Sequence, residues 1–182
     1  MMEQNRIVLS GAGGQGVITA AIILAEAAVL HEGLNAVQSQ SYGAEARGGA
    51  TRSDVIISDS EIFFPKVTQP NTLVCLTQAA YNSYSLLIRP GGLLITDSRY
   101  VVPEKKVDAR QAALPMHETV MAKIGVAVVY NICVLGALVR MTEVVSPESI
   151  LKVLETRLPA KTLATNRAAL DLGLDLAGSG GA

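Results

Sequence analysis

The sequence contains few of the residues that bind metals or stack on aromatic ligands. Its 182 residues include no tryptophan, two histidines and two cysteines, and aromatic residues make up only 4%. The core must therefore consist mainly of Ala, Val, Leu and Ile. Cys75 and Cys133 stand alone in apolar runs, so we expect buried free thiols, and this chain cannot hold an iron–sulfur cluster or a structural zinc by itself. His31 and His117 are equally isolated, and we expect both to be structural.

Strong charge of one sign and long hydrophobic runs are also missing. The formal net charge of −1 at pH 7 gives no reason to expect nucleic acid or an anionic membrane as a partner. The sequence has no basic start followed by a cleavable apolar segment, so we expect no signal peptide. The apolar run Val126–Val139 is too short for a membrane span and contains Asn131. We therefore expect a cytoplasmic protein.

The length favours a single domain over residues 1–182, which would bury about 70% of the surface of the unfolded chain. No internal repeat or linker divides the sequence. The last residues, 178–182, are glycine-rich, and we expect a disordered tail there.

The chain begins with a strand pattern, a glycine cluster and a helical pattern, in that order. The apolar residues 7–9 and Ser10 lead into Gly11–Gly16, and a mostly apolar, Ala-rich stretch follows over 17–32. That order is typical of the first βα unit of an open α/β sheet. The start of such a helix presents unpaired N–H groups and a partial positive charge, which can hold an anion.

Three of these glycines fit the dinucleotide-binding pattern G-x-G-x-x-G: Gly11 for a tight turn, Gly13 for close backbone approach and Gly16 for helix packing. A dinucleotide site also needs an acidic residue at the end of the second strand. The second predicted strand, 35–40, is followed by Ser-Tyr-Gly and has no carboxylate at its end. Binding of a small anion, or a turn that serves only packing, is therefore favoured over NAD, and the residues leave both readings open.

Alternating strand and helix patterns predict a single three-layer α/β/α domain with a mixed, mostly parallel sheet of about five to seven strands. A short polar turn after 51–58 predicts an antiparallel hairpin with 61–64. Residues 101–113 fit two short strands. Further strands are expected at 73–76 and 93–96, and helices at 78–88, 115–125, 126–141, 147–158 and 161–177. The apolar helix at 126–141 should be buried or lie at an interface, and the hydroxyl of Ser146 should cap the helix that follows it.

A second stretch able to carry function is the loop Tyr42–Gly49, which follows the second strand. It should meet the glycine turn at the edge where open α/β sheets bind ligands. The planar fork of Arg47 suits a phosphate or a carboxylate. A pair of Arg47 with Glu45 or Asp54 that fixes the loop is the alternative. Nothing in the sequence marks Glu45 as a general base.

These two stretches together resemble the gamma subunit of the 2-oxoacid:ferredoxin oxidoreductases. The 2-oxoglutarate type is most similar, the ketoisovalerate (branched-chain) and pyruvate types are also similar, and the indolepyruvate type is less so. The resemblance covers nearly the whole chain. It rests on Gly11-Ala12-Gly13-Gly14-Gln15-Gly16-Val17, Tyr42-Gly43-Ala44-Glu45-Ala46-Arg47-Gly48-Gly49, Ile57-Ser58-Asp59, Gln78-Ala79-Ala80-Tyr81, Asn131 with Leu135-Gly136-Ala137, and Asn166 with Ala168-Ala169.

The resemblance implies one subunit of an enzyme. Such an assembly cleaves a 2-oxoacid on thiamine diphosphate with magnesium, passes electrons through iron–sulfur clusters to ferredoxin, and transfers the acyl group to coenzyme A. Alpha, beta and, where present, ferredoxin-like delta chains would carry those groups, so no catalytic residue or metal ligand is expected here. The gamma chain would help form the coenzyme A site and the contacts between subunits. The residues implied are Gly11, Gly13, Gly14, Gln15, Gly16, Tyr42, Arg47, Gly48 and Gly49.

A self-contained nucleotide-binding protein, dehydrogenase-like or regulatory, is the alternative function. The missing carboxylate after the second strand argues against it. Under the subunit interpretation, the isolated chain should oxidise no 2-oxoacid, since it holds neither the cofactor that stabilises a carbanion nor an electron acceptor.

Overall fold

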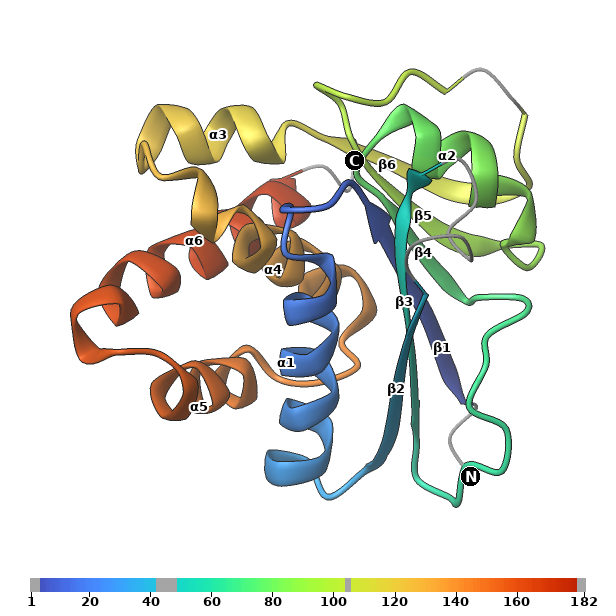
Figure 1. The fold of residues 1–182 in the computed structure, drawn as a ribbon, viewed down its shortest axis with the longest axis horizontal. Helices are drawn as coiled ribbons and strands as arrows, with labels where there is room; N and C mark the ends of the chain where they lie inside the picture. Colours follow the sequence, from blue (N-terminus) through green and yellow to red (C-terminus); the bar gives the residue numbers. More distant parts are fainter. Residues whose placement is uncertain (1–3, 42–48, 104–105, 180–182) are drawn as a thin grey trace.

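The computed structural model describes residues 4–41, 49–103 and 106–179. Within these ranges a six-stranded sheet is covered by helices on both faces (Figure 1). The elements are β1 (Asn5–Gly11), α1 (Val17–His31), β2 (Asn35–Ser41), β3 (Thr51–Ser58), β4 (Thr72–Cys75), α2 (Gln78–Tyr84), η3 (Ser85–Leu87), β5 (Gly92–Asp97), β6 (Ala109–Leu114), α3 (Met116–Lys123), η4 (Ala127–Val129), α4 (Tyr130–Thr142), α5 (Pro147–Arg157) and α6 (Ala160–Ser179).

The strands follow the order β2-β3-β1-β4-β5-β6. β1, β4, β5 and β6 pair in parallel, whereas β3 runs antiparallel between β2 and β1. In the middle of β1, Val8 lies opposite Asp54 of β3 on one side and Leu73 of β4 on the other. The predicted mixed, mostly parallel sheet is confirmed, and its strand number falls in the expected range.

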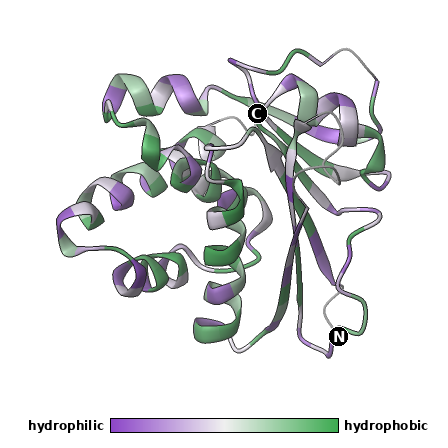
Figure 2. Cartoon of the chain, in the orientation of Figure 1, coloured by the Kyte–Doolittle hydropathy of each residue, from purple (hydrophilic) through white to green (hydrophobic). Residues whose placement is uncertain are grey.

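The two faces of the sheet bury separate cores, which confirms the three-layer prediction. Side chains alternate across a strand, so Ile7 and Leu9 of β1 face the larger core, which includes α1 and α3–α6. Val8 faces a smaller core with Tyr81 and Tyr84 of α2. Helix α1 is hydrophobic along nearly its whole length (Figure 2) because it packs against β2 and β3 on one side and against α4 and α5 on the other.

Helices α4 and α6 approach so closely that their backbones touch. A Cβ atom on Gly173 of α6 would overlap the carbonyl oxygen of Cys133, and one on Gly136 of α4 would overlap the carbonyl oxygen of Leu170. Glycine is therefore required at both positions by packing inside this chain.

The predicted hairpin of 51–58 with 61–64 is wrong. Residues 61–67 form no strand, and the side chains of Phe63 and Phe64 are 85% and 62% exposed. The reason lies in the sheet, because β3 already pairs with β1 on one side and with β2 on the other. Neither edge of β3 is left for a further strand.

The apolar stretch 126–141 is a helix only from Tyr130 onward. Gly125 has a positive φ of 75° and ends the preceding segment, and residues 127–129 form a single 3₁₀ turn. The predicted helix therefore starts too early, and Val128 in this turn is 81% exposed in the single chain. Residues 130–139 are buried as expected.

The structure also settles three other segment ends predicted from the sequence. Of the two strands expected in 101–113, the described residues contain one, β6, and positions 104–105 lie outside them. Helix α6 continues through Gly178 and Ser179, which the sequence assigned to a tail, and 180–182 lie outside the described residues. Ser146 caps α5 as predicted by accepting a hydrogen bond from the N–H of Ser149.

Among the helices described, none combines the length and apolarity needed to cross a membrane.

Candidate functional site

Several helices begin at one edge of the sheet, where its parallel strands end (Figure 1). β1 leads through the glycine turn (residues 11–16) into α1, β4 leads into α2, and β6 leads into α3. Helix α4 also starts there, because Asn131 in its first turn contacts Gly16. Open α/β sheets bind ligands at such an edge.

The glycine turn is held by its own glutamine. The N–H of Ala12 donates to Gln15 Oε1 at 2.7 Å, and the N–H of Gln15 donates to the Ala12 carbonyl at 3.3 Å. Gly11 is the last residue of β1, and a Cβ there would overlap Gln15 Oε1. Gly11 therefore makes room for the Gln15 side chain, and the predicted ligand role of both residues stays a prediction.

Gly13 and Gly14 are exposed, and a Cβ on either would meet nothing within 4 Å. Gly14 needs its freedom for a φ of +85°, whereas the φ of Gly13 is not positive. Within the described residues, no hydrogen bond uses the N–H of either glycine. The N–H groups in the first turn of an α-helix also have no partner within the helix, so this segment offers several backbone donors close together in the sequence.

Gly16 is the N-cap of α1, and its backbone is left-handed with φ 72° and ψ 19°. Asn131 Nδ2 donates to the Gly16 carbonyl at 3.3 Å, and a Cβ on Gly16 would lie 2.6 Å from that nitrogen. The sequence predicted that Gly16 allows close helix–strand packing. The close neighbour is instead the side chain of another helix, α4.

The sequence analysis missed a buried carboxylate at the end of β5. Asp97 is fully buried and accepts hydrogen bonds from the N–H of Arg99 (2.9 Å), the N–H of His117 (2.8 Å) and the hydroxyl of Tyr130 (2.7 Å). It therefore ties the start of α3 and the start of α4 to the sheet. The signal was present, since an acidic residue directly follows the predicted strand 93–96.

Aromatic side chains surround His117 beside this carboxylate. Its ring contacts Tyr100 and Tyr130 edge-on, with centroid distances of 5.2 and 5.3 Å. Its Nδ1 is buried and has no hydrogen-bond partner among the described residues. Burial, followed by the nearby Asp97 charge, raises the pKa of Tyr130, so its hydroxyl keeps its proton and acts as a donor. These contacts give Tyr130 and His117 a structural role at this edge of the sheet.

Much of the second predicted site lies outside the described residues, including Tyr42, Arg47 and Gly48. Gly49 is described, is exposed and has a φ of +76°. The two ends of the loop lie near the glycine turn, because Gly11 is opposite Thr51 and Ser41 is opposite Arg52 in the sheet. Convergence of the two loops stays a prediction, and this register supports it.

Asp54, the alternative partner of Arg47, is bound by another arginine. Arg52 Nε and Nη2 donate to its two carboxylate oxygens at 2.6 and 3.1 Å, and the N–H of Val67 donates at 2.9 Å. The Arg52 guanidinium also lies over the ring of Tyr84, 5.3 Å from its centroid. An Arg47–Asp54 pair would have to compete with these contacts.

The two cysteines are buried free thiols, as predicted. Cys75 lies in β4 and Cys133 in α4, and burial raises the pKa of each to about 12. Thiolates bind metals, so neither residue fits a cluster site. In the part of the chain that the structure describes, no group of three or more His, Cys, Asp or Glu could hold a metal ion.

Residues 6–176 match the pyruvate ferredoxin/flavodoxin oxidoreductase family. The chain belongs to this family. It is 44% identical to the 2-oxoglutarate synthase subunit KorC of Methanocaldococcus jannaschii over 96% of this chain and 94% of that protein. The comparisons support a subunit of an oxoacid:ferredoxin oxidoreductase and do not favour the self-contained nucleotide-binding alternative.

Two solved structures have the same fold. The gamma subunit of a keto/oxoacid ferredoxin oxidoreductase from Geobacter sulfurreducens matches with a TM-score of 0.86 and 41% identity, covering 96% of this chain and 99% of that one. The 2-oxoglutarate:ferredoxin oxidoreductase of Magnetococcus marinus, solved with 2-oxoglutarate, coenzyme A and succinyl-CoA bound, matches with a TM-score of 0.87 and 23% identity. That match covers 98% of this chain and 32% of the other chain, and it shows the fold alone.

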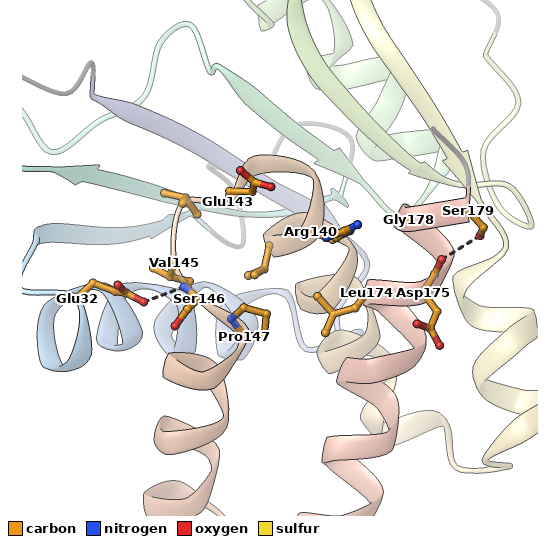
Figure 3. A pocket seen from close by; sticks show the side chains of 12 residues that line it. Glu32, Arg140, Glu143, Val145, Ser146, Pro147, Leu174, Asp175, Gly178 and Ser179 are labelled. Carbon is orange, nitrogen blue, oxygen red and sulfur yellow. Dashed lines mark hydrogen bonds between the residues drawn. The ribbon is translucent and has the colours of Figure 1, made fainter. Parts of the chain in front are cut away.

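A large cavity lies elsewhere, at the far end of α1 (Figure 3). Its volume is about 920 Å³, and Val145, Pro147 and Leu174 give it an apolar floor. Glu32 at its rim accepts hydrogen bonds from the N–H of Ser146 (2.8 Å) and the hydroxyl of Ser149 (2.7 Å), which lower its pKa. None of the predicted site residues lines this cavity. The 15 residues of α1 separate it from the glycine turn by about 22 Å.

Proposed function

We propose that this chain is the gamma subunit of an enzyme that oxidatively decarboxylates 2-oxoglutarate to an acyl-CoA and reduces ferredoxin. The full-length identity of 44% with a 2-oxoglutarate synthase subunit supports this substrate over the pyruvate and ketoisovalerate alternatives. The substrate itself would be recognised by another chain of the complex, and the isolated chain would be inactive.

The groups that carry the redox chemistry belong to the partner chains in this proposal. Thiamine diphosphate with magnesium would be held by the alpha and beta subunits, and the iron–sulfur clusters by these or a ferredoxin-like delta subunit. The two thiols of this chain are buried in separate elements, so they do not fit an iron–sulfur cluster. We also assign the complex to the cytoplasm.

The part that this chain would contribute is a binding surface for coenzyme A. The glycine turn offers backbone N–H groups at the start of a 15-residue helix, and such helix starts favour the negative charge of phosphate groups. The observation that carries the proposal is the open space at Gly13 and Gly14, where a Cβ would meet no atom of the described residues within 4 Å. Arg47, Gly48 and Tyr42 would contribute from the second loop.

A matched pair of substitutions tests this role. Gly14 (φ +85°) and Gly33 (φ +67°) both have left-handed backbones and open space where a Cβ would be, so alanine should strain both by roughly 1–2 kcal/mol. Only Gly14 lies in the proposed site. In the complex with its partner subunits, Gly14→Ala should raise the Michaelis constant for coenzyme A about tenfold, and Gly33→Ala should leave it unchanged. Equal Michaelis constants in the two variants would contradict the proposal.

A further inference from the structure

The glycine turn is supported from outside by one polar side chain. Asn131 lies in the first turn of α4, is 7% exposed, and donates from Nδ2 to the Gly16 carbonyl at 3.3 Å. The same carbonyl accepts the N–H of Ala20 at 2.9 Å and so begins the hydrogen-bond ladder of α1. Asn131 therefore binds the residue at which the turn becomes the helix.

The contact leaves no room for a side chain at Gly16. A Cβ there would lie within 2.6–2.8 Å of three atoms of the Asn131 side chain. The left-handed conformation of Gly16 and the position of Asn131 thus depend on each other. If α4 moved, the first turn of α1 would lose the group that fixes its N-cap.

Helix α4 is itself fixed at this point. The hydroxyl of Tyr130, next to Asn131, donates to the buried Asp97 carboxylate at 2.7 Å. That carboxylate also accepts the N–H groups of Arg99 and His117. The end of β5 therefore holds Tyr130, and the neighbouring Asn131 extends this support to Gly16.

Stability alone is a poor explanation for an amide at this position. The residues that follow Asn131 in α4, from Ile132 to Val139, are all buried and apolar or glycine. Burying an amide is costly unless it is well hydrogen-bonded, and a bond of 3.3 Å is at the long end of the normal range. An apolar side chain of similar size would fill the same space without that cost.

We propose that Asn131 is a positioning residue that holds the turn 13–16 in the conformation in which its N–H groups bind coenzyme A. This proposal rests on the function proposed above. Asn131 touches Gly16 and acts through it, because the conformation of Gly16 sets the direction of the N–H groups before it. Loss of the amide should loosen the turn and weaken coenzyme A binding, with the fold retained.

A matched control is available in α6. Asn166 is 8% exposed and, like Asn131, donates its amide to one backbone carbonyl, that of Thr162 at 2.9 Å. This bond lies within α6 itself, whereas the bond of Asn131 reaches the glycine turn. Asn131→Leu and Asn166→Leu therefore remove buried amides of similar exposure, one that is hydrogen-bonded to the glycine turn and one that is hydrogen-bonded to its own helix.

The test compares steady-state kinetics of these variants in the complex with its partner subunits. Asn131→Leu should raise the Michaelis constant for coenzyme A roughly tenfold, leave kcat at saturating coenzyme A nearly unchanged, and speed amide hydrogen exchange across residues 12–17. Asn166→Leu should leave all three at the wild-type value. Asn131→Asp, which keeps the shape but loses the N–H donor, covers the case in which the leucine variant fails to fold and should show the same rise.

The outcomes separate the two proposals. If Gly14→Ala raises the Michaelis constant and the Asn131 variants do not, the positioning role is overturned and the coenzyme A site stands. If Gly14→Ala has no effect either, both proposals are overturned. Equal effects of Asn131→Leu and Asn166→Leu would also overturn the positioning role, since they would reflect a general loss of stability.

Discussion

Two pairs of glycines in this chain occupy opposite environments. Gly136 and Gly173 lie at the crossing of α4 and α6, where a Cβ would overlap a backbone carbonyl of the other helix. Gly13 and Gly14 lie on the exposed turn before α1, where a Cβ would meet nothing. The first pair is explained entirely by contacts within this chain. Gly14 is explained in part by its positive φ, whereas no contact among the described residues explains Gly13.

The difference separates glycines that packing within this chain requires from glycines that the proposed coenzyme A site would require. A glycine that packing requires should be sensitive in any assay of stability, whereas a glycine that packing does not require points to an approaching molecule. The cavity at the far end of α1 has a volume of about 920 Å³, yet none of the predicted site residues lines it, and the Glu32 carboxylate there is already hydrogen-bonded to Ser146 and Ser149. Cavity size therefore does not locate the candidate site in this fold.

The largest effect should come from the helix crossing. Gly173→Ala forces α4 and α6 apart, and overpacking of this kind should cost about 3 kcal/mol. The melting temperature of the chain should fall by about 6–12 °C, from the scaling for a protein of this size. Thermal unfolding followed by circular dichroism measures this directly.

Gly178→Ala is the control in the same helix. A Cβ there would lie 3.5 Å from Arg140 Nε, an ordinary contact with a flexible side chain. Alanine favours helices over glycine by up to about 1 kcal/mol, so this variant should melt at or above the wild-type temperature. A loss like that of Gly173→Ala would show that the crossing is not the sensitive feature.

The second effect concerns Arg47, in the second predicted site over residues 42–49. Arg47→Ala in the assembled complex should raise the Michaelis constant for coenzyme A by about 10- to 100-fold, the loss of one charge-assisted contact of roughly 1.5–3 kcal/mol. Decarboxylation of the 2-oxoacid on thiamine should change little. If Arg47 only fixes its own loop, gel filtration will show weaker subunit association and the coenzyme A kinetics will not change.

The smallest effect is expected at the far cavity. The pKa of Glu32 is lowered by hydrogen bonds from the Ser146 N–H and then the Ser149 hydroxyl, so its stabilising effect is present above the unfolded pKa. Glu32→Gln should lower the free energy of unfolding at pH 7 by less than about 1 kcal/mol, because the carboxylate is exposed. The difference from wild type should vanish as the pH falls below about 4. The Michaelis constant for coenzyme A should be the same in Glu32→Gln and wild type. A change in it would show that the cavity at one end of α1 affects the glycine turn at the other.

Local patterns predicted the parts of the fold that depend on neighbouring residues. The first βα unit, the cap at Ser146 and the buried strands at 73–76 and 93–96 follow from periodicity and capping chemistry, and the structure confirms them. The hairpin at 61–64 failed because strand pairing is decided by the whole sheet. β3 inserts between β1 and β2, and no local signal shows that both its edges are filled.

The candidate site was predicted only in part for the same reason. The glycine turn is visible in the sequence, but its supports are distant along the chain. Asn131 contacts Gly16 across more than one hundred positions, and Asp97 meets His117 and Tyr130 only after three elements have packed. The motif gave the location of the turn, and the fold supplied the residues that hold it.

Gly13→Ala tests the central claim most directly, because this glycine has neither a positive φ nor a neighbour within 4 Å. The substitution should leave the melting temperature of the chain unchanged. In the assembled complex it should raise the Michaelis constant for coenzyme A about tenfold, since the added methyl group would lie where the ligand approaches the backbone. An unchanged Michaelis constant in a correctly assembled complex would contradict the assignment of the glycine turn to coenzyme A.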